Sequence, residues 1–140
     1  MAEQEQNKVR FELVSPQKLV LSRQVDMVVV PGAEGDFGVL PRHSLLISTV
    51  RPGVIEVYEG GAVKERIFVA GGFAEVTPER CTVLADEALP VDKIEPASVE
   101  AQLKDLREDA ADAGSIEARA AAEKAIAVAE AKLAARQNSA

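Results

Sequence analysis

The stretch that decides the fold is an apolar segment followed by a glycine-rich acidic loop, and it reads Val28-Val29-Val30-Pro31-Gly32-Ala33-Glu34-Gly35-Asp36-Phe37-Gly38-Val39-Leu40-Pro41-Arg42-His43-Ser44. Its leading valines are typical of a strand. Pro31 and Pro41 fix their own φ and favour an extended conformation of the residue before them. The glycines between them, Gly32, Gly35 and Gly38, permit backbone angles that a side chain forbids. We therefore expect a strand, a stiff acidic tip and the start of a second strand.

Apolar and polar residues alternate with the period of a strand over much of residues 9–88. The alternating apolar residues are Val9, Phe11 and Leu13 and, in a second run around Asp26, Val25, Met27 and Val29. Turn signals recur at Ser15-Pro16, Pro31-Gly32, Pro52-Gly53, Gly60-Gly61, Gly71-Gly72 and Thr77-Pro78. This spacing predicts a small antiparallel β-sandwich or barrel.

Two of these turn signals have specific interpretations. Gly60-Gly61 lies between Val54–Tyr58 and Val63–Val69, and it predicts the clearest hairpin of the chain. Gly71-Gly72 follows an apolar strand, but no lysine stands at the P-loop position and the next segment is strand-like. We therefore expect a bulge or sharp bend there rather than a phosphate cradle.

The composition changes near residue 90, where alanine and charged residues replace β-branched residues. We expect a β-sandwich domain at 1–90 and an α-helical hairpin at 91–140. Pro96 suits the first turn of one helix, and Ser115 can cap a second helix after the break at 113–114. The apolar stripes are Val99, Leu103, Leu106 and Ala110 on the first helix and Ala122, Ile126, Ala129 and Leu133 on the second. So short a loop makes the two helices antiparallel.

The seam between these two helices is thin, because three of its eight apolar residues are alanine and only five are larger. Alanine favours helix formation but buries little area. Full burial of a larger apolar side chain contributes about 1.5–3 kcal/mol, and ordering costs offset much of that gain. We expect the hairpin to dock weakly and to be mobile.

The composition excludes several classes of function. The 140 residues carry a net charge of −7, and no basic stripe stands out, which argues against nucleic acid and anionic lipid as partners. No apolar run is long enough to span a membrane, and the first ten residues do not resemble a signal peptide. The single cysteine, Cys81, permits no intramolecular disulfide and is expected to be a buried strand residue. We expect a soluble intracellular protein.

No pattern in the sequence assembles a catalytic site, a metal site or a cofactor site. His43 is the sole histidine, so every catalytic triad must use it, and adjacent strand positions would point His43 and Ser44 to opposite faces. One histidine and one distant cysteine leave too few ligands for zinc.

Glu34 and Asp36 allow three interpretations on composition alone: an acid and base pair or calcium ligands, a solvated turn, or an acidic contact for a positively charged partner. Calcium needs more oxygen ligands than this loop supplies.

Three motifs together resemble the epsilon subunit of the F-type rotary ATP synthase: the glycine-rich acidic stretch, Arg51-Pro52-Gly53-Val54-Ile55, and Phe68-Val69-Ala70-Gly71-Gly72-Phe73-Ala74-Glu75-Val76. The likeness is strong over residues 11–88 and looser afterwards. It implies a non-catalytic subunit of the central stalk. In that family a ten-stranded sandwich binds the gamma shaft and the loops of the membrane rotor ring, while a helical hairpin lies folded or extends beside the shaft. The extended hairpin blocks ATP hydrolysis.

The resemblance also assigns contacts. It implies a rotor-ring contact at Gly32, Ala33, Glu34, Gly35 and Asp36, with Ala33 where some members have a polar residue, and a gamma contact at His43, Ser44, Leu45 and Leu46. Further contacts of the hairpin with alpha and beta subunits stay open. The location implied is the cytoplasmic face of the bacterial inner membrane, held peripherally by the complex.

Some members of that family bind ATP at the hairpin through a motif of Ile or Leu, Asp, two spacers, Arg and Ala. At the matching place, Glu95 replaces the aspartate and Ser98 replaces the arginine, so the triphosphate loses its charged fork. We expect no nucleotide site, no metal and no other cofactor.

Binding of the sandwich to its partners should rest mainly on apolar contacts, because exposed ion pairs contribute only about 0–1 kcal/mol each. We therefore expect an exposed hydrophobic patch on one face of the sandwich. Two other interpretations stay open: a small hydrolase that uses His43, and a free-standing sandwich adaptor whose helices bind a partner groove.

Overall fold

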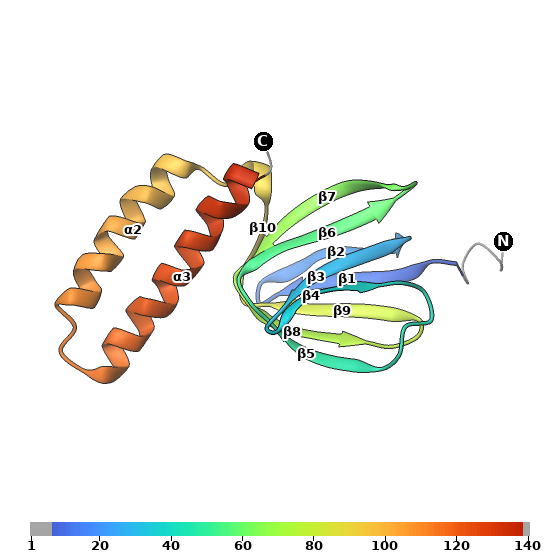
Figure 1. The fold of residues 1–140 in the computed structure, drawn as a ribbon, viewed down its shortest axis with the longest axis horizontal. Coiled ribbons are helices and arrows are strands. Elements are labelled where there is room, and N and C mark those ends of the chain that lie inside the picture. The colour runs from blue at the N-terminus through green and yellow to red at the C-terminus, as the bar shows by residue number, and fades with distance from the viewer. Residues whose placement is uncertain (1–6, 139–140) are drawn as a thin grey trace. The chain divides into compact units, whose positions relative to one another are not determined.

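The computed structural model describes residues 7–138, and the chain divides into two compact units, one ending at Pro90 and one beginning at Val91 (Figure 1). In the described part of the first unit the strands are β1 (Val9–Ser15), β2 (Lys18–Val25), β3 (Met27–Gly32), β4 (Gly35–Val39), β5 (Leu46–Val50), β6 (Gly53–Glu59), β7 (Ala62–Val69), β8 (Gly72–Val76), β9 (Arg80–Ala85) and β10 (Ala88–Pro90). The fold class predicted from the sequence, a ten-stranded β-sandwich followed by two helices, is confirmed.

The strands form one hydrogen-bonded path in the order β10-β7-β6-β3-β5-β8-β9-β1-β2, with β4 paired to β3. All these pairings are antiparallel except that of β1 with β9, which is parallel. Arg23 of β2 forms ion pairs with Glu59 of β6 at 3.4 Å and with Glu65 of β7 at 3.3 Å. These pairs link the last strand of the path to strands near its beginning, so the sheet closes over its own inner face.

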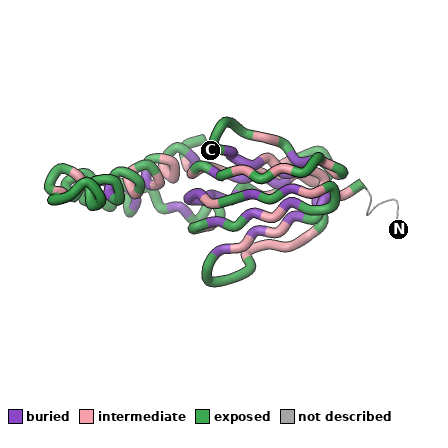
Figure 2. Tube along the Cα trace, turned by 90° about the horizontal axis from the view of Figure 1, so that it is seen from below, coloured by how far each residue is buried: buried purple, intermediate pink, exposed green. Residues whose placement is uncertain are grey.

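That inner face holds one apolar cluster, to which strands distant in the path contribute (Figure 2). Val9, Phe11 and Leu13 of β1 are fully buried, which confirms the first predicted alternation. The second predicted run is interrupted, because β2 ends at Val25 and β3 begins at Met27. In β3 the alternate valines, Val28 and Val30, face the core, whereas Met27 and Val29 are half-buried.

Asp26 marks this break between β2 and β3. Its backbone N–H donates to the carbonyl of Tyr58 at 3.0 Å, and its carboxylate accepts hydrogen bonds from Lys8 and, at 2.7 Å, from the N–H of Gly60. The hydrogen bond from Lys8, together with the smaller effect of that from Gly60, lowers the pKa of Asp26 below its usual value.

The hairpin predicted from Gly60-Gly61 is confirmed as β6 and β7, with Gly60 and Gly61 at φ of 64° and 80° in the turn.

The turn at the acidic tip is shorter than the three glycines of this stretch suggest. Gly35 pairs with Gly32, and β4 continues from Gly35 to Val39, so only Ala33 and Glu34 form the turn. Glycine does not by itself prevent strand pairing, and an antiparallel partner supplies the hydrogen bonds that hold Asp36 and Phe37 extended.

The second unit consists of a short 3-10 helix η1 (Val91–Lys93) and the helices α2 (Pro96–Ala111) and α3 (Ile116–Asn138), which run antiparallel (Figure 1). Pro96 opens α2 as expected. The hydroxyl of Ser115 accepts a hydrogen bond from the N–H of Ala118 at 3.0 Å and so caps α3.

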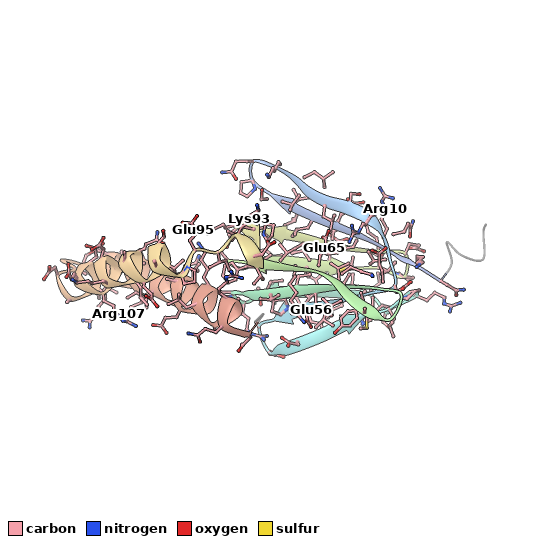
Figure 3. The ribbon with its side chains drawn as sticks, turned by 90° about the horizontal axis from the view of Figure 1, so that it is seen from above. Arg10, Glu56, Glu65, Lys93, Glu95 and Arg107 are labelled. Atoms are coloured by element: carbon pink, nitrogen blue, oxygen red, sulfur yellow. The ribbon has the colours of Figure 1, made fainter. Side chains whose placement is uncertain are left out.

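The seam of this hairpin is as thin as the sequence predicts. Its buried helical residues are Val99 and Leu103 on α2 and Ala122, Ala129 and Ala135 on α3, while Leu106, Ile126 and Leu133 are only half-buried. Arg107 of α2 and Glu130 of α3 form an exposed ion pair at 3.7 Å (Figure 3), a type of contact worth about 0–1 kcal/mol.

The predicted bend at Gly71-Gly72 is confirmed, with φ of 126° and 136° between β7 and β8. A Cβ atom added to Gly72 would lie 2.0 Å from the carbonyl oxygen of Leu84, so β8 and β9 could not keep their pairing.

We expect Gly72→Ala to destabilise the folded protein by about 3 kcal/mol, because it combines backbone strain at positive φ with an impossible contact. Urea unfolding of the full-length protein followed by circular dichroism measures this loss. Gly114→Ala is the matched control, because nothing lies within 4 Å of its added Cβ. Equal unfolding midpoints for the two variants would contradict the assignment.

Candidate functional site

The acidic turn, defined as Gly32 to Asp36, projects from the end of the β3–β4 hairpin. A Cβ added to Gly32 would lie 2.7 Å from the carbonyl oxygen of Gly35 and 2.9 Å from the ring of Phe37, so the close approach requires glycine. Glu34 is exposed, and within residues 7–138 its carboxylate has neither a hydrogen bond nor an ion pair.

Asp36, in contrast, already has a partner within the chain. Nη2 of Arg51 lies 2.5 Å from Oδ1 of Asp36, and Nη1 of the same guanidinium donates to the carbonyl of Gly32 at 2.5 Å. The structure therefore brings the predicted acidic residues together on one turn. Within the described residues, the carboxylate of Asp36 has an ion-pair partner and that of Glu34 has none.

The second predicted segment, His43 to Leu46, connects β4 to β5 and is mostly a loop rather than a strand. This corrects the expectation that His43 and Ser44 occupy adjacent strand positions. Nδ1 of His43 lies 2.7 Å from the carbonyl oxygen of Ser44, so the ring contacts its neighbour's backbone. Leu45 is 75% exposed, whereas Leu46 is half-buried and packs against the core. Of these four residues, Leu45 offers the large apolar surface.

The outer face of the sandwich carries a row of side chains that are paired directly across five neighbouring strands. The apolar row, as we call it, consists of Phe73 on β8, Leu84 on β9, Val14 on β1 and Leu19 on β2, and Thr49 on β5 continues the row beyond Phe73. Phe73 and Leu84 are 57% and 54% exposed. Contiguous exposed apolar area of this kind marks an interaction surface, so the expected hydrophobic patch is confirmed.

Mostly charged or polar side chains border this row on one side. The adjacent outward positions, in the same strand order, are Ile47, Glu75, Thr82, Glu12 and Ser22. The border is therefore polar on four strands and apolar on β5, where Ile47 is 77% exposed. Arg10 donates to Glu12 at 3.2 Å and to Ser22 at 3.0 Å, which fixes this polar border. A patch with a polar rim resembles the surface of one protein that binds another.

Sequence reasoning did not identify the individual residues of the apolar row. The available signal was an apolar residue at an outward strand position, where alternation calls for a polar one: Val14 after Leu13 and Leu84 after Val83. That signal is weak in isolation. It becomes informative only when the register places Val14, Leu84 and Phe73 side by side.

The remaining candidate residues show few features of a reactive site. Cys81 is fully buried, as the sequence predicts, and burial raises the pKa of its thiol from 9.0 to about 12. Across the described residues, no group of three histidine, cysteine or acidic side chains could hold a metal ion. At the start of α2, the hydroxyl of Ser98 donates to Oε2 of Glu95 at 3.3 Å.

Within residues 7–138, no helix has both the length and the apolar character that a membrane span requires.

A sandwich that presents an exposed apolar row and an acidic turn has the surface features of a protein that binds other proteins. Two family models match the sequence: the beta-sandwich domain of the ATP synthase delta/epsilon chain over residues 8–91, and the C-terminal domain of the ATP synthase epsilon chain over residues 95–140. The protein therefore belongs to the ATP synthase epsilon chain family, whose members are non-catalytic subunits of the F-type complex.

Curated relatives agree with this assignment. The ATP synthase epsilon chain of Rhodospirillum rubrum is 57% identical over 127 residues, which cover 91% of this chain and 95% of the relative. The ATP synthase epsilon chain of Paramagnetospirillum magneticum is 56% identical over 128 residues, covering 91% and 96%. Each alignment covers 91% of this chain, so it includes most of the sandwich and most of the hairpin.

Solved structures share the fold at lower identity. A subunit of the Euglena gracilis mitochondrial ATP synthase, in a structure of OSCP, F1 and the c-ring, has a TM-score of 0.80 and 24% identity, covering 92% of this protein and 81% of that subunit. A subunit of the Tetrahymena thermophila mitochondrial ATP synthase, in a structure of the central stalk and c-ring, has a TM-score of 0.63 at 13% identity, covering 92% and 96%.

We expect the thiol of Cys81 to resist modification in the folded protein at pH 8. A thiol with a pKa of about 12 is almost entirely protonated at that pH, and the thiolate is the reacting form. Reaction with a chromogenic disulfide, followed spectroscopically, should be at least about a hundredfold slower in buffer than in denaturing urea. Equal rates in the two solvents would show that the β9 strand opens readily.

Proposed function

We propose that this protein joins the gamma shaft of the ATP synthase to the membrane rotor ring during ATP synthesis, and that its hairpin restrains ATP hydrolysis. The observation that carries the first part is the exposed apolar row on an otherwise well-packed sandwich. Membership of the epsilon chain family supports both parts.

The apolar row and the segment from His43 to Leu46, in which Leu45 is the most exposed apolar side chain, form the proposed contact with gamma. Each large side chain that becomes fully buried contributes about 1.5–3 kcal/mol, so a few such residues can provide most of a stable interface. Phe73 lies between Thr49 and Leu84 and is the one aromatic side chain of the row, and aromatic side chains contribute strongly when an interface buries them.

The acidic turn forms the proposed contact with the rotor ring. Exposed ion pairs contribute only about 0–1 kcal/mol each, so Glu34 sets register and steers the approach of a basic ring loop rather than supplying most of the affinity. The two proposed surfaces have different physical characters, which suits two different partners.

A subunit between shaft and ring must resist deformation under load. Ion flow supplies roughly 2.3 kcal/mol per charge per 100 mV, and a compliant link would dissipate this energy. The sandwich meets this requirement, because backbone hydrogen bonds join its strands along a continuous path and the strands share one packed core.

The hairpin is proposed to be the regulatory part. Its seam buries mainly alanine, so little free energy opposes a change in its packing. The hairpin is then available to contact alpha and beta subunits when it extends. We place the assembled subunit on the cytoplasmic face of the bacterial inner membrane, which its bacterial relatives support.

We expect Phe73→Asp to weaken binding of the full-length protein to gamma by roughly tenfold to a hundredfold, because it places a charge within an apolar interface. Calorimetry with the gamma subunit measures the affinity. Ile116→Asp is the control, since Ile116 is 86% exposed but lies on α3, outside the apolar row. Native affinity of Phe73→Asp would exclude the row as the gamma contact.

We expect removal of the residues after Pro90 to raise ATP hydrolysis by the reconstituted ATP synthase several-fold, because the restraint is lost while the sandwich keeps its contacts. Hydrolysis is measured at saturating ATP, and ATP-driven proton pumping checks that coupling persists. Unchanged hydrolysis with normal pumping would mean that the hairpin is not a brake.

A further inference from the structure

We infer that Arg51 is the positioning residue of the acidic turn: its guanidinium fixes the turn in its binding shape and pairs with Asp36, so that Glu34 is the unpaired carboxylate presented to the partner. This inference rests on the proposed ring contact and names the residue that prepares it. It assigns a role to the Arg51-Pro52-Gly53 motif, which neither proposed contact uses.

The guanidinium bridges the two strands of the β3–β4 hairpin. Nη1 donates to the carbonyl of Gly32, the last residue of β3, and Nη2 contacts Oδ1 of Asp36 on β4, each at 2.5 Å. Because one rigid planar group makes both contacts, it restricts the separation and the twist of the two strands at the point where the turn begins.

The backbone around Arg51 reinforces this arrangement. Its N–H donates to the carbonyl of Pro31 at 2.9 Å, and the N–H of Ala33 donates to the carbonyl of Thr49 at 2.9 Å. Gly53 permits the segment to approach, since a Cβ there would lie 3.0 Å from the Cβ of Pro31. Arg51 is thus anchored by its own main chain directly beside the turn that its side chain holds.

The two carboxylates of the turn are consequently not equivalent. The carboxylate of Asp36 pairs with an adjacent guanidinium at the surface, whereas Glu34 is exposed and, within the described residues, unpartnered. A cationic loop of the rotor ring that approaches the turn finds Glu34 available without displacing an existing ion pair. Preformed geometry of this kind improves binding, because less ordering is needed when the partner arrives.

Electrostatic attraction and positioning of the turn predict opposite changes in binding affinity for Arg51→Gln, which makes the inference testable. Arg51→Gln makes the turn more negative, so attraction to a cationic loop alone would tighten binding. If Arg51 positions the turn, the same substitution weakens binding by roughly twofold to tenfold, since the strand ends and the turn must be ordered on contact. Arg51→Lys keeps the charge without the planar fork and should recover only part of the loss.

The experiment measures the affinity of full-length variants for ATP synthase membranes from which this subunit has been removed. Arg66→Gln is the matched control: Arg66 is as exposed as Arg51, at 43%, and pairs with Glu56 at 3.3 Å, away from the turn. Hydrogen exchange in the free protein gives a second readout, and we expect faster exchange at the N–H of Ala33 in Arg51→Gln but not in Arg66→Gln.

The outcomes separate the inference from the proposed ring contact. Weaker binding by both Glu34→Gln and Arg51→Gln, with a smaller effect of Arg51→Gln when Asp36→Asn is also present, supports the inference. Weaker binding by Glu34→Gln with equal or tighter binding by Arg51→Gln overturns the positioning role alone. If Glu34→Gln binds like the native protein, the acidic turn is not the ring contact and both ideas fail.

Discussion

The parallel pairing of β1 with β9 is the interaction on which the rest of the sandwich depends. It joins the first strand of the sandwich to the ninth, and β2 then follows β1 to the end of the hydrogen-bonded path. Arg23 of β2 reaches Glu59 and Glu65 of β6 and β7, so the path closes around the core. The same pairing sets Val14 beside Leu84 and thereby builds the apolar row on the outside. One register therefore determines both the buried face and the proposed binding face.

The two proposed contact surfaces use different physical principles. The apolar row gains free energy from removing carbon surface from water, so it suits a contact that must persist under load. The acidic turn contributes mainly orientation and approach, because exposed charges interact weakly in water. Its usefulness depends on shape, which Gly32 permits through close approach and Arg51 maintains through its guanidinium. A subunit that contacts two partners can in this way hold one firmly and align the other.

The helical unit differs from the sandwich in how it is stabilised. The buried positions of α3 are alanines, and a capping serine and exposed ion pairs supply the remaining contacts. Such a hairpin keeps its helices through propensity while offering little buried area for tertiary contacts. These properties suit an element that changes partners, whereas the packed core of the sandwich suits a fixed link.

The local structure could be predicted from the amino-acid sequence alone. Alternation marked β1, adjacent glycines marked the β6–β7 turn, and Pro96 and Ser115 marked where the two helices begin, because each of these signals acts over a few residues. The sequence also carried the family resemblance, through motifs whose residues lie close together along the chain. Only the tertiary structure decided which carboxylate of the acidic turn is free and which outward side chains adjoin. Both depend on pairing between distant segments, Arg51 with Asp36 and β1 with β9, and no local pattern encodes the register of strands that lie far apart in sequence.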